Sequence, residues 1–356
     1  MDWWDVVTDT FESVGEANVP IVGLLANIRR FPEDPAASIS NVVSMYAPPV
    51  TMAMAMKAAI TGEPNVGGAG STPIIAAGLS TLKEMLEQCG SGEPDQGEEL
   101  KRGADRFRAL QQDITQAGSP ASWKGAASNS YAFKNAHQAI RAQVISSADA
   151  TISEILAAEA GQVASTRNSI NLAIRYLNAC IPVAISLGAL PEGGTLASYG
   201  YQVRVVAEAV PPAALSFALM SAGAQANAAR IKSAAAGYMT AGNASPPSPG
   251  GRTDRLAVDT EDLRHSAGKQ QALASMIEQA TAEPVETPNK VTQSHGTVCA
   301  DTAVATSFAM LNRVKASEAM QAESLKLGKG LEAAADLYEA VDRHWQSQLD
   351  RVVRTR

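Results

Sequence analysis

The chain has 356 residues and a net charge of −7, and 46% of its residues are hydrophobic although only 5% are aromatic. A single core rarely grows past about 250–300 residues, so this length predicts two or three domains. Small aliphatic side chains favour closely packed helices over sheets, and an acidic chain without a basic cluster argues against nucleic-acid binding.

The three cysteines, Cys89, Cys180 and Cys299, are odd in number and far apart. This pattern excludes the dense disulfide framework of small secreted domains. Buried free thiols and a single bridge between domains or molecules both stay open.

Residues 1–95 alternate short apolar runs with Gly and Pro, as in "FPEDPAASIS" and "GEPNVGGAGSTP". This punctuation predicts an irregular helical segment of short helices and loops. The opening "MDWWDVVTDTFESVG" is acidic and lacks the basic start and the cleavage site of a Sec or Tat signal peptide. If the protein leaves the cell, we expect a route that does not use a signal peptide.

Residues 96–239 have the pattern of a helical domain. An amphipathic helix is predicted over residues 97–117. A second, much longer helix is predicted from the "SWKG" turn at 122–125 to about Leu187, with Pro182 kinking rather than ending it. Two helices joined by a short turn bury their apolar stripes only if they lie antiparallel, so Trp123 is expected at the tip of a hairpin. The predicted stripes are Leu100, Ala104, Phe107, Leu110 and Ile114 on the first helix, and Ile152, Leu156, Ala160, Val163, Ile170, Ile174, Leu177 and Ile181 on the second.

A turn is predicted at 191–200, followed by further helix over 201–240 that Pro211-Pro212 interrupts. Residues 205–229 are the most membrane-like stretch, but they include Glu208 and the two prolines, so we expect a buried or membrane-touching helix rather than a constitutive anchor. Residues 240–255, rich in Gly, Ser and Pro, are predicted to be a flexible linker.

Residues 256–356 predict a second hairpin. Its first helix opens at an Asp259/Thr260 cap, and Pro284 and Pro288 break the pattern. The second helix is expected from Cys299 to about Val352. Its predicted apolar stripe is Val304, Phe308, Leu311, Leu325, Leu331, Ala334, Tyr338, Val341, Trp345, Leu349 and Val352.

No motif in the sequence supports catalysis. "GEPNVGGAGST" resembles a phosphate loop, but Gly68 stands where the motif needs lysine. The histidines, His137, His265, His295 and His344, lack metal-binding spacing, and the sequence has neither CxxC nor a nucleophile elbow. We therefore predict a protein that is not an enzyme and has no cofactor and no metal.

The stretch "WKGAASNSYAFKNAHQAIRAQV", followed by "STRNSINLA" and "IPVAISL", carries a resemblance. Trp123 and Gly125 match the W-x-G turn of the WXG proteins, the helical hairpins exported by mycobacterial type VII (ESX) secretion. About residues 95–240 resemble the EspA and EspE secretion-associated proteins, in which such a turn also leads into a long helix.

About residues 255–353 resemble a second group, the EspC and EspF proteins. "VTQSHGTVCADTAVATSFAML" matches their S-H-G turn through His295 and Gly296, and "YEAVD" matches their Tyr-x-x-x-Asp/Glu export signal through Tyr338 and Asp342. His295 departs from the W-x-G pattern, so the resemblance does not imply that this turn has the same function as the Trp123 turn.

The resemblance implies an all-α fold of two long antiparallel hairpins packed as a bundle. It implies a non-enzymatic ESX substrate, cytoplasmic before export and then secreted or at the cell surface, with a role in secretion, assembly or virulence. Its partners would be the secretion machinery, including an ATPase and a dedicated chaperone, and other copies or other ESX substrates. In that family the W-x-G turn and the export signal meet at one end of the bundle, so Trp123 is expected beside Tyr338 and Asp342.

Two alternatives stay open. The protein could be an intracellular or envelope-bound helical scaffold that keeps the hairpins and has lost export. It could also be an effector that perturbs membranes through residues 201–240, in which case it would contact a membrane directly.

Overall fold

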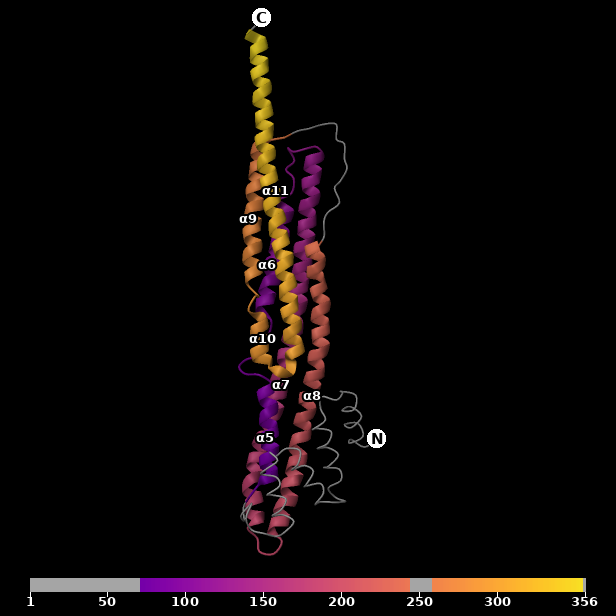
Figure 1. The fold of residues 1–356 in the computed structure, drawn as a ribbon, viewed down its shortest axis with the longest axis vertical. Coiled ribbons are helices and arrows are strands. Elements are labelled where there is room, and N and C mark those ends of the chain that lie inside the picture. The colour runs from indigo at the N-terminus through magenta and orange to yellow at the C-terminus, as the bar shows by residue number, and fades with distance from the viewer. Residues whose placement is uncertain (1–70, 244–257, 355–356) are drawn as a thin grey trace. The chain divides into compact units, whose positions relative to one another are not determined.

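A computed structural model describes residues 71–243 and 258–354, and these residues form helices and turns with no strand among them. The helices are α5 (Pro73–Gln88), α6 (Glu98–Gln116), α7 (Ala126–Gly188), α8 (Gly194–Asn243), α9 (Thr260–Ala282), α10 (Thr287–His295), the short 3₁₀ helix η2 (Thr297–Cys299) and α11 (Ala300–Arg354) (Figure 1). The predicted all-α bundle is confirmed. Most of the predicted N-terminal segment, residues 1–70, and most of the predicted linker, residues 244–257, lie outside the described part, and the first four linker residues are the last turn of α8.

The chain forms two compact units. Among the described residues, unit 1 takes in residues 71–94, Glu159–Ala226 and Val291–Ala300, and unit 2 takes in Asp95–Ala158 and residues 227–243, 258–290 and 301–354. The long helices α7 and α8 each contribute one part to either unit. The units cut across the ranges read from the sequence, so those domain boundaries stay a prediction.

Unit 1 has an apolar core built from α5, the later part of α7 and the earlier part of α8. The predicted stripe of α7 lies in this core: Val163, Ile170 and Leu177 are fully buried. Cys89, Cys180 and Cys299 belong to the same core and are free thiols.

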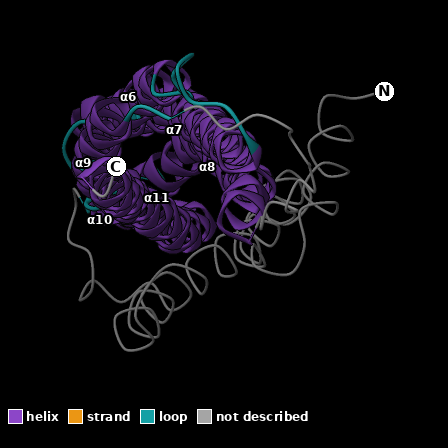
Figure 2. Ribbon diagram, turned by 90° about the horizontal axis from the view of Figure 1, so that it is seen from above, coloured by secondary structure: helices purple, strands orange, loops and turns teal. Residues whose placement is uncertain are grey.

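Unit 2 packs the two predicted hairpins against each other. The predicted stripe of α6 is buried throughout, and α6 lies against α9. Polar bridges join the hairpins: Gln270 on α9 donates to the Tyr131 hydroxyl at 3.0 Å, and Gln138 on α7 donates to the Met320 carbonyl at 2.9 Å. Looking along the helices, Figure 2 shows α6, α9 and α11 side by side.

At three places the helices are interrupted less than the sequence suggested. The turn expected at 191–200 ends at Gly193, where Glu192 and Gly193 have positive φ angles of 51° and 85°, and α8 begins at Gly194. α8 also continues through Pro211-Pro212. The apolar neighbours of Pro211 are buried in the unit 1 core, and this packing compensates for the two missing N–H donors. Pro288 is the second residue of α10 and does not break a helix, because the N–H groups of the first helical turn have no partner within the helix.

The predicted stripe of α11 is wrong over much of its length. Val304, Leu311 and Leu325 are 64%, 63% and 40% exposed, whereas Leu331 is buried as expected. Small and polar side chains face the inside, including Ala305, Ala309, Arg313, Ala316, Ser317 and Ser324. Small residues allow neighbouring helices to approach closely, so the largest apolar residues of α11 do not mark its buried face.

Candidate functional site

The turn between α6 and α7 is held by short-range hydrogen bonds. The Trp123 N–H donates to the Pro120 carbonyl at 3.0 Å, and the Ser128 hydroxyl donates to the Trp123 carbonyl at 2.9 Å. Gly125 is buried with φ of 126°, a backbone conformation that side chains disfavour, and α7 begins at the next residue. Local geometry therefore explains the glycine two residues after the tryptophan.

Trp123 plugs the end of the hairpin. Its side chain is 5% exposed and belongs to an apolar cluster in unit 2 with Tyr131, Leu263, Ala267, Leu327, Leu331 and Ala335. The ring centroids of Trp123 and Tyr131 are 5.6 Å apart with planes tilted by 41°. The buried Trp123 Nε1 has no hydrogen-bond partner among the described residues. Packing therefore governs this position.

Tyr338 packs against this same cluster and is half-buried, and Asp342, one turn later on α11, is exposed. Tyr338 therefore lies against the cluster that contains Trp123, and Asp342 lies on the surface of the helix. The turn that carries Trp123 and the part of α11 that carries Tyr338 therefore pack in one cluster, although these two residues are far apart in the sequence. The function of these residues as an export signal stays a prediction.

Arg264 on α9 forms ion pairs with α11 close to Tyr338. Its guanidinium donates to Asp336 at 2.8 Å and to Glu339, and the bond to Glu339 holds the pKa of that carboxyl below its ordinary value. Asp342 is not part of this ion-pair group. Its carboxylate is therefore left on the surface of the helix.

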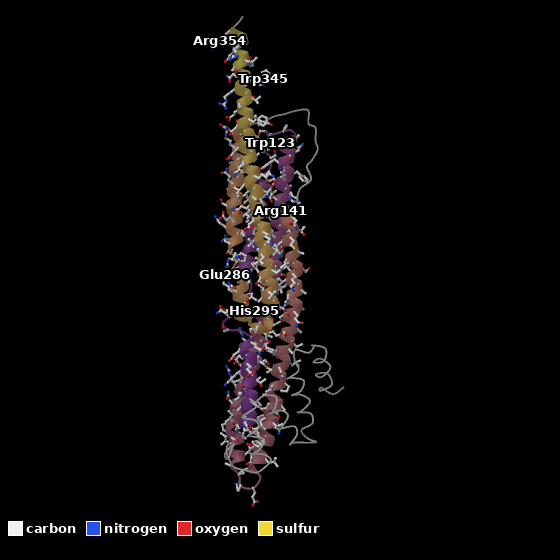
Figure 3. All side chains as sticks on the ribbon, viewed as in Figure 1. Trp123, Arg141, Glu286, His295, Trp345 and Arg354 are labelled. Carbon is white, nitrogen blue, oxygen red and sulfur yellow. The ribbon has the colours of Figure 1, made fainter. Side chains whose placement is uncertain are left out.

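Beyond Glu339, α11 has little packing around it. We call residues 340–354 the free end of α11. Its side chains between 340 and 351 are exposed apart from the half-buried Gln348, and at ~1.5 Å per residue the segment is roughly 20 Å long. Four large apolar side chains mark this end of the helix with a spacing of four: Leu337, Val341, Trp345 and Leu349. Figure 3 shows Trp345 on the part of α11 that extends past Trp123.

Sequence reasoning missed a buried ion pair in unit 2. Arg313 Nε lies 2.8 Å from Asp149 Oδ1, both side chains are at most 1% exposed, and the Tyr238 hydroxyl donates to Asp149 at 2.6 Å. Arg313 also donates to the Ala280 carbonyl and lies 5.2 Å from the Phe107 ring centroid. Burial raises the pKa of Asp149, and the charge of Arg313 opposes that shift. A lone arginine among alanines and apolar residues was the available signal.

The S-H-G turn between α10 and α11 lies in unit 1 and has another environment. His295 is fully buried, and its Nδ1 lies 2.9 Å from Glu159 Oε1. Gly296 has φ of 76°, and a Cβ there would lie 2.2 Å from the Gln88 carbonyl oxygen. A turn lies at Gly296, where the sequence analysis expected one, and Ser294, His295 and Gly296 are all buried. Any function of this turn stays a prediction.

Among the helices that the structure describes, α7 and α8 are long and apolar enough to cross a membrane by length and composition. In the most apolar window of each, 28% and 50% of the residues are buried inside the protein. A core helix of a soluble protein passes the same test, so this is weak evidence for membrane insertion.

Known proteins match the chain in two separate segments. The EspA/EspE family matches residues 89–172, and the family "Excreted virulence factor EspC, type VII ESX diderm" matches residues 252–351. The "ESX-1 secretion-associated protein EspE" of Mycolicibacterium smegmatis (strain ATCC 700084 / mc(2)155) is 28% identical over 207 residues, which cover 54% of this chain and 39% of that protein. The match thus spans well under half the length of this relative. No solved structure matches the chain.

Proposed function

We propose that this chain, an EspA/EspE-like protein with an EspC-like C-terminal segment, is a non-enzymatic substrate of an ESX type VII secretion system. It is made in the cytoplasm and exported as a folded helical bundle to the cell surface or the medium. The two family matches and the secretion-associated relative support the class of protein. The geometry around Tyr338 supports the choice of signal.

The free end of α11 is the observation that best supports an export signal in this part of the chain. A lone helix of this length is marginal in water because nucleation is unfavourable, yet the segment exposes Val341, Trp345 and Leu349. An apolar stripe on a projecting helix suits a groove on a partner protein. The exposed Asp342 beside it offers a charge that fixes the register of binding.

Trp123 acts through position rather than direct contact in this proposal. It is too deeply buried to be read, but it packs in the cluster that supports Tyr338. Removing either aromatic side chain would loosen the start of the free end. The pair therefore forms one composite element, with Asp342 and the apolar stripe as the part that the secretion ATPase or a dedicated chaperone binds.

Comparing the culture filtrate with the cell lysate tests the function. In a strain with an intact ESX system the full-length chain should reach the filtrate together with known exported proteins. In a matched strain without the system it should stay in the lysate. Retention in both strains would favour the scaffold alternative, and equal release from both would point to another export route.

A second candidate, a membrane-perturbing effector, is favoured by the apolar length of α8. Leakage of dye from liposomes made with anionic lipids would support it. The unit 1 core already buries Val205, Val206 and Val210 of this helix, so leakage would require α8 to leave its core. For that reason we prefer the substrate role.

A further inference from the structure

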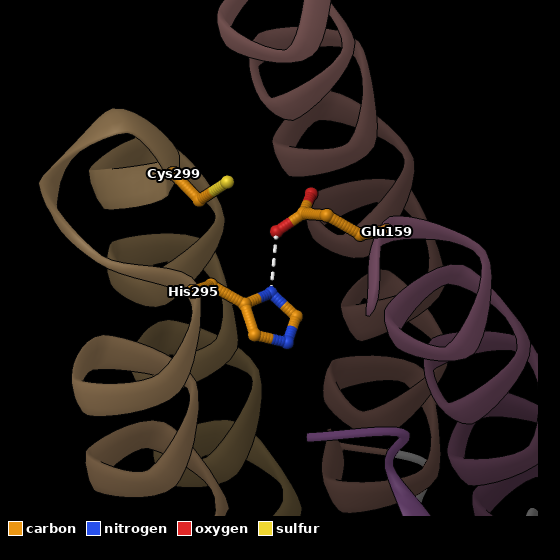
Figure 4. A group of neighbouring side chains, drawn as sticks. All are labelled: Glu159, His295 and Cys299. Carbon is orange, nitrogen blue, oxygen red and sulfur yellow. Dashed lines mark hydrogen bonds and ion pairs between the residues drawn. The ribbon is translucent and has the colours of Figure 1, made fainter. Parts of the chain in front are cut away.

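Three metal-ligating side chains meet in the core of unit 1. Glu159 comes from α7, His295 is the last residue of α10 and Cys299 is the last residue of η2. All three are 0% exposed, and their ligand atoms lie within 4.8 Å of one another. Figure 4 shows the imidazole and the thiol directed toward the Glu159 carboxylate, with Nδ1 bonded to Oε1 at 2.9 Å.

The backbone around this cluster is firmly fixed. Arg167 on α7 donates to the Cys89 carbonyl at 2.7 Å and also to the Ser294 carbonyl, so one side chain ties both turns next to the cluster. The Ser91 N–H donates to the Gln293 carbonyl at 3.1 Å. A set of ligands held by such a shell needs little reorganisation when an ion binds.

The chemistry of the three donors is selective. A carboxylate and a thiolate in an apolar core are costly unless their charge is compensated. A divalent cation would balance one carboxylate and one thiolate beside a neutral imidazole. Zinc accepts this combination of sulfur, nitrogen and oxygen ligands, whereas magnesium and calcium prefer oxygen alone.

We propose that Glu159, His295 and Cys299 form a buried Zn²⁺ site, with Oε1, Nδ1 and Sγ as the ligand atoms. Tetrahedral zinc with bonds of about 2.0 Å to nitrogen and oxygen and about 2.3 Å to sulfur sets its ligand atoms roughly 3.3–3.6 Å apart. The atoms of the cluster reach such a geometry through side-chain shifts of about 1 Å. Binding releases the thiol proton and requires Nδ1 to carry no proton, so the neutral imidazole that binds through Nδ1 carries its proton on Nε2. Three protein ligands leave a fourth coordination position.

Such a site would tie α7 to the turn that joins α10 and α11. The sequence alone gave no hint of it, because Glu159 and His295 are 136 positions apart and the spacing of His295 and Cys299 matches no zinc motif. The prediction of a chain without metal rested on spacing alone. This proposal concerns the structure of unit 1 and does not depend on export.

Cobalt titration of the full-length protein tests the site. The protein is purified under a non-thiol reductant, stripped with a chelator and titrated with Co²⁺. The wild-type chain should bind one equivalent with a sulfur-to-cobalt charge-transfer band that added Zn²⁺ abolishes, and Zn²⁺ should raise its melting temperature. Cys299→Ser should lose the band, and Glu159→Gln and His295→Gln should weaken Co²⁺ binding at least tenfold.

Cys180→Ser is the matched control, because Cys180 is another buried cysteine of the unit 1 core outside the cluster. This variant should keep the band and the zinc effect on melting. A folded wild-type protein that shows no band and no zinc-dependent rise in melting temperature would overturn the proposal, whatever the variants do. A band that persists in Cys299→Ser would also overturn it.

Discussion

α11 is one continuous helix with two different surroundings. Between Ala300 and Glu339 its inner face is packed, and it buries Arg313 and small residues. Beyond Glu339 it exposes Trp345 and Leu349 at 62% and 64%. The difference teaches that hydrophobicity does not decide which part of this helix is buried. The packed part contributes to the stability of the fold. The free end has large apolar side chains that are exposed and contribute little to the core.

The largest expected effect lies in the packed part. Arg313→Ala leaves the Asp149 carboxylate buried without its charge partner and removes the bond to the Ala280 carbonyl. Removing one partner of a buried ion pair destabilises by about 3–5 kcal/mol. Urea denaturation followed by circular dichroism measures this loss. Arg343→Ala, at an exposed arginine of the free end, is the control and should stay within about 0.5 kcal/mol of the wild type.

The second effect concerns the joint between the two parts. Trp123→Ala empties the centre of its cluster and should cost about 3 kcal/mol, the lower end of the range for buried aromatic residues, because the site is at the end of a hairpin. Tyr338→Ala acts on the same cluster. The two changes should therefore be non-additive in a double-mutant cycle of unfolding free energy, and full additivity would mean that the aromatic side chains do not support each other.

A smaller effect is expected on the free end itself. Trp345→Ala should change the free energy of unfolding by less than about 0.5 kcal/mol, since its side chain has little packing to lose. The comparison with Trp123→Ala uses the same residue type in two surroundings. Equal destabilisation by both substitutions would show that the free end is packed in solution, for example in an oligomer.

The smallest effect is that of pH on the ion pairs just before the free end. Arg264 lowers the pKa of Glu339, so the pair contributes stability above the unfolded-state pKa of about 4.5 and loses it as the pH falls through the lowered folded-state value. The melting temperatures of wild type and Glu339→Gln should differ slightly at neutral pH and converge near pH 3. A constant difference would assign the effect to something other than this charge.

Much of the fold could be predicted because helix periodicity and punctuation are local signals. The stripe of α6, the cap at Asp259 and the long helix after Trp123 all follow from spacing and side-chain chemistry. The continuation of α8 through Pro211-Pro212 could not be predicted from such local signals. Its stability there comes from the core around it, which is not a property of the local sequence.

The candidate site was predicted only in part. The resemblance singled out Trp123, Tyr338 and Asp342, and it also implied that the two aromatic residues lie close together. The buried face of α11 was missed, because close helix contact favours alanine and serine over leucine. The pairing of Arg313 with Asp149 and of Glu159 with His295 was missed as well, since each joins distant segments.

Export of Asp342→Ala compared with Asp350→Ala tests the central claim most directly. Both are exposed aspartates of the free end, so each substitution removes the same charge with little effect on folding. We predict that Asp342→Ala stays in the cell lysate with unchanged helical circular dichroism, while Asp350→Ala reaches the culture filtrate like the wild type. Export of both variants, or loss of folding in Asp342→Ala, would contradict the claim that this carboxylate is part of an export signal.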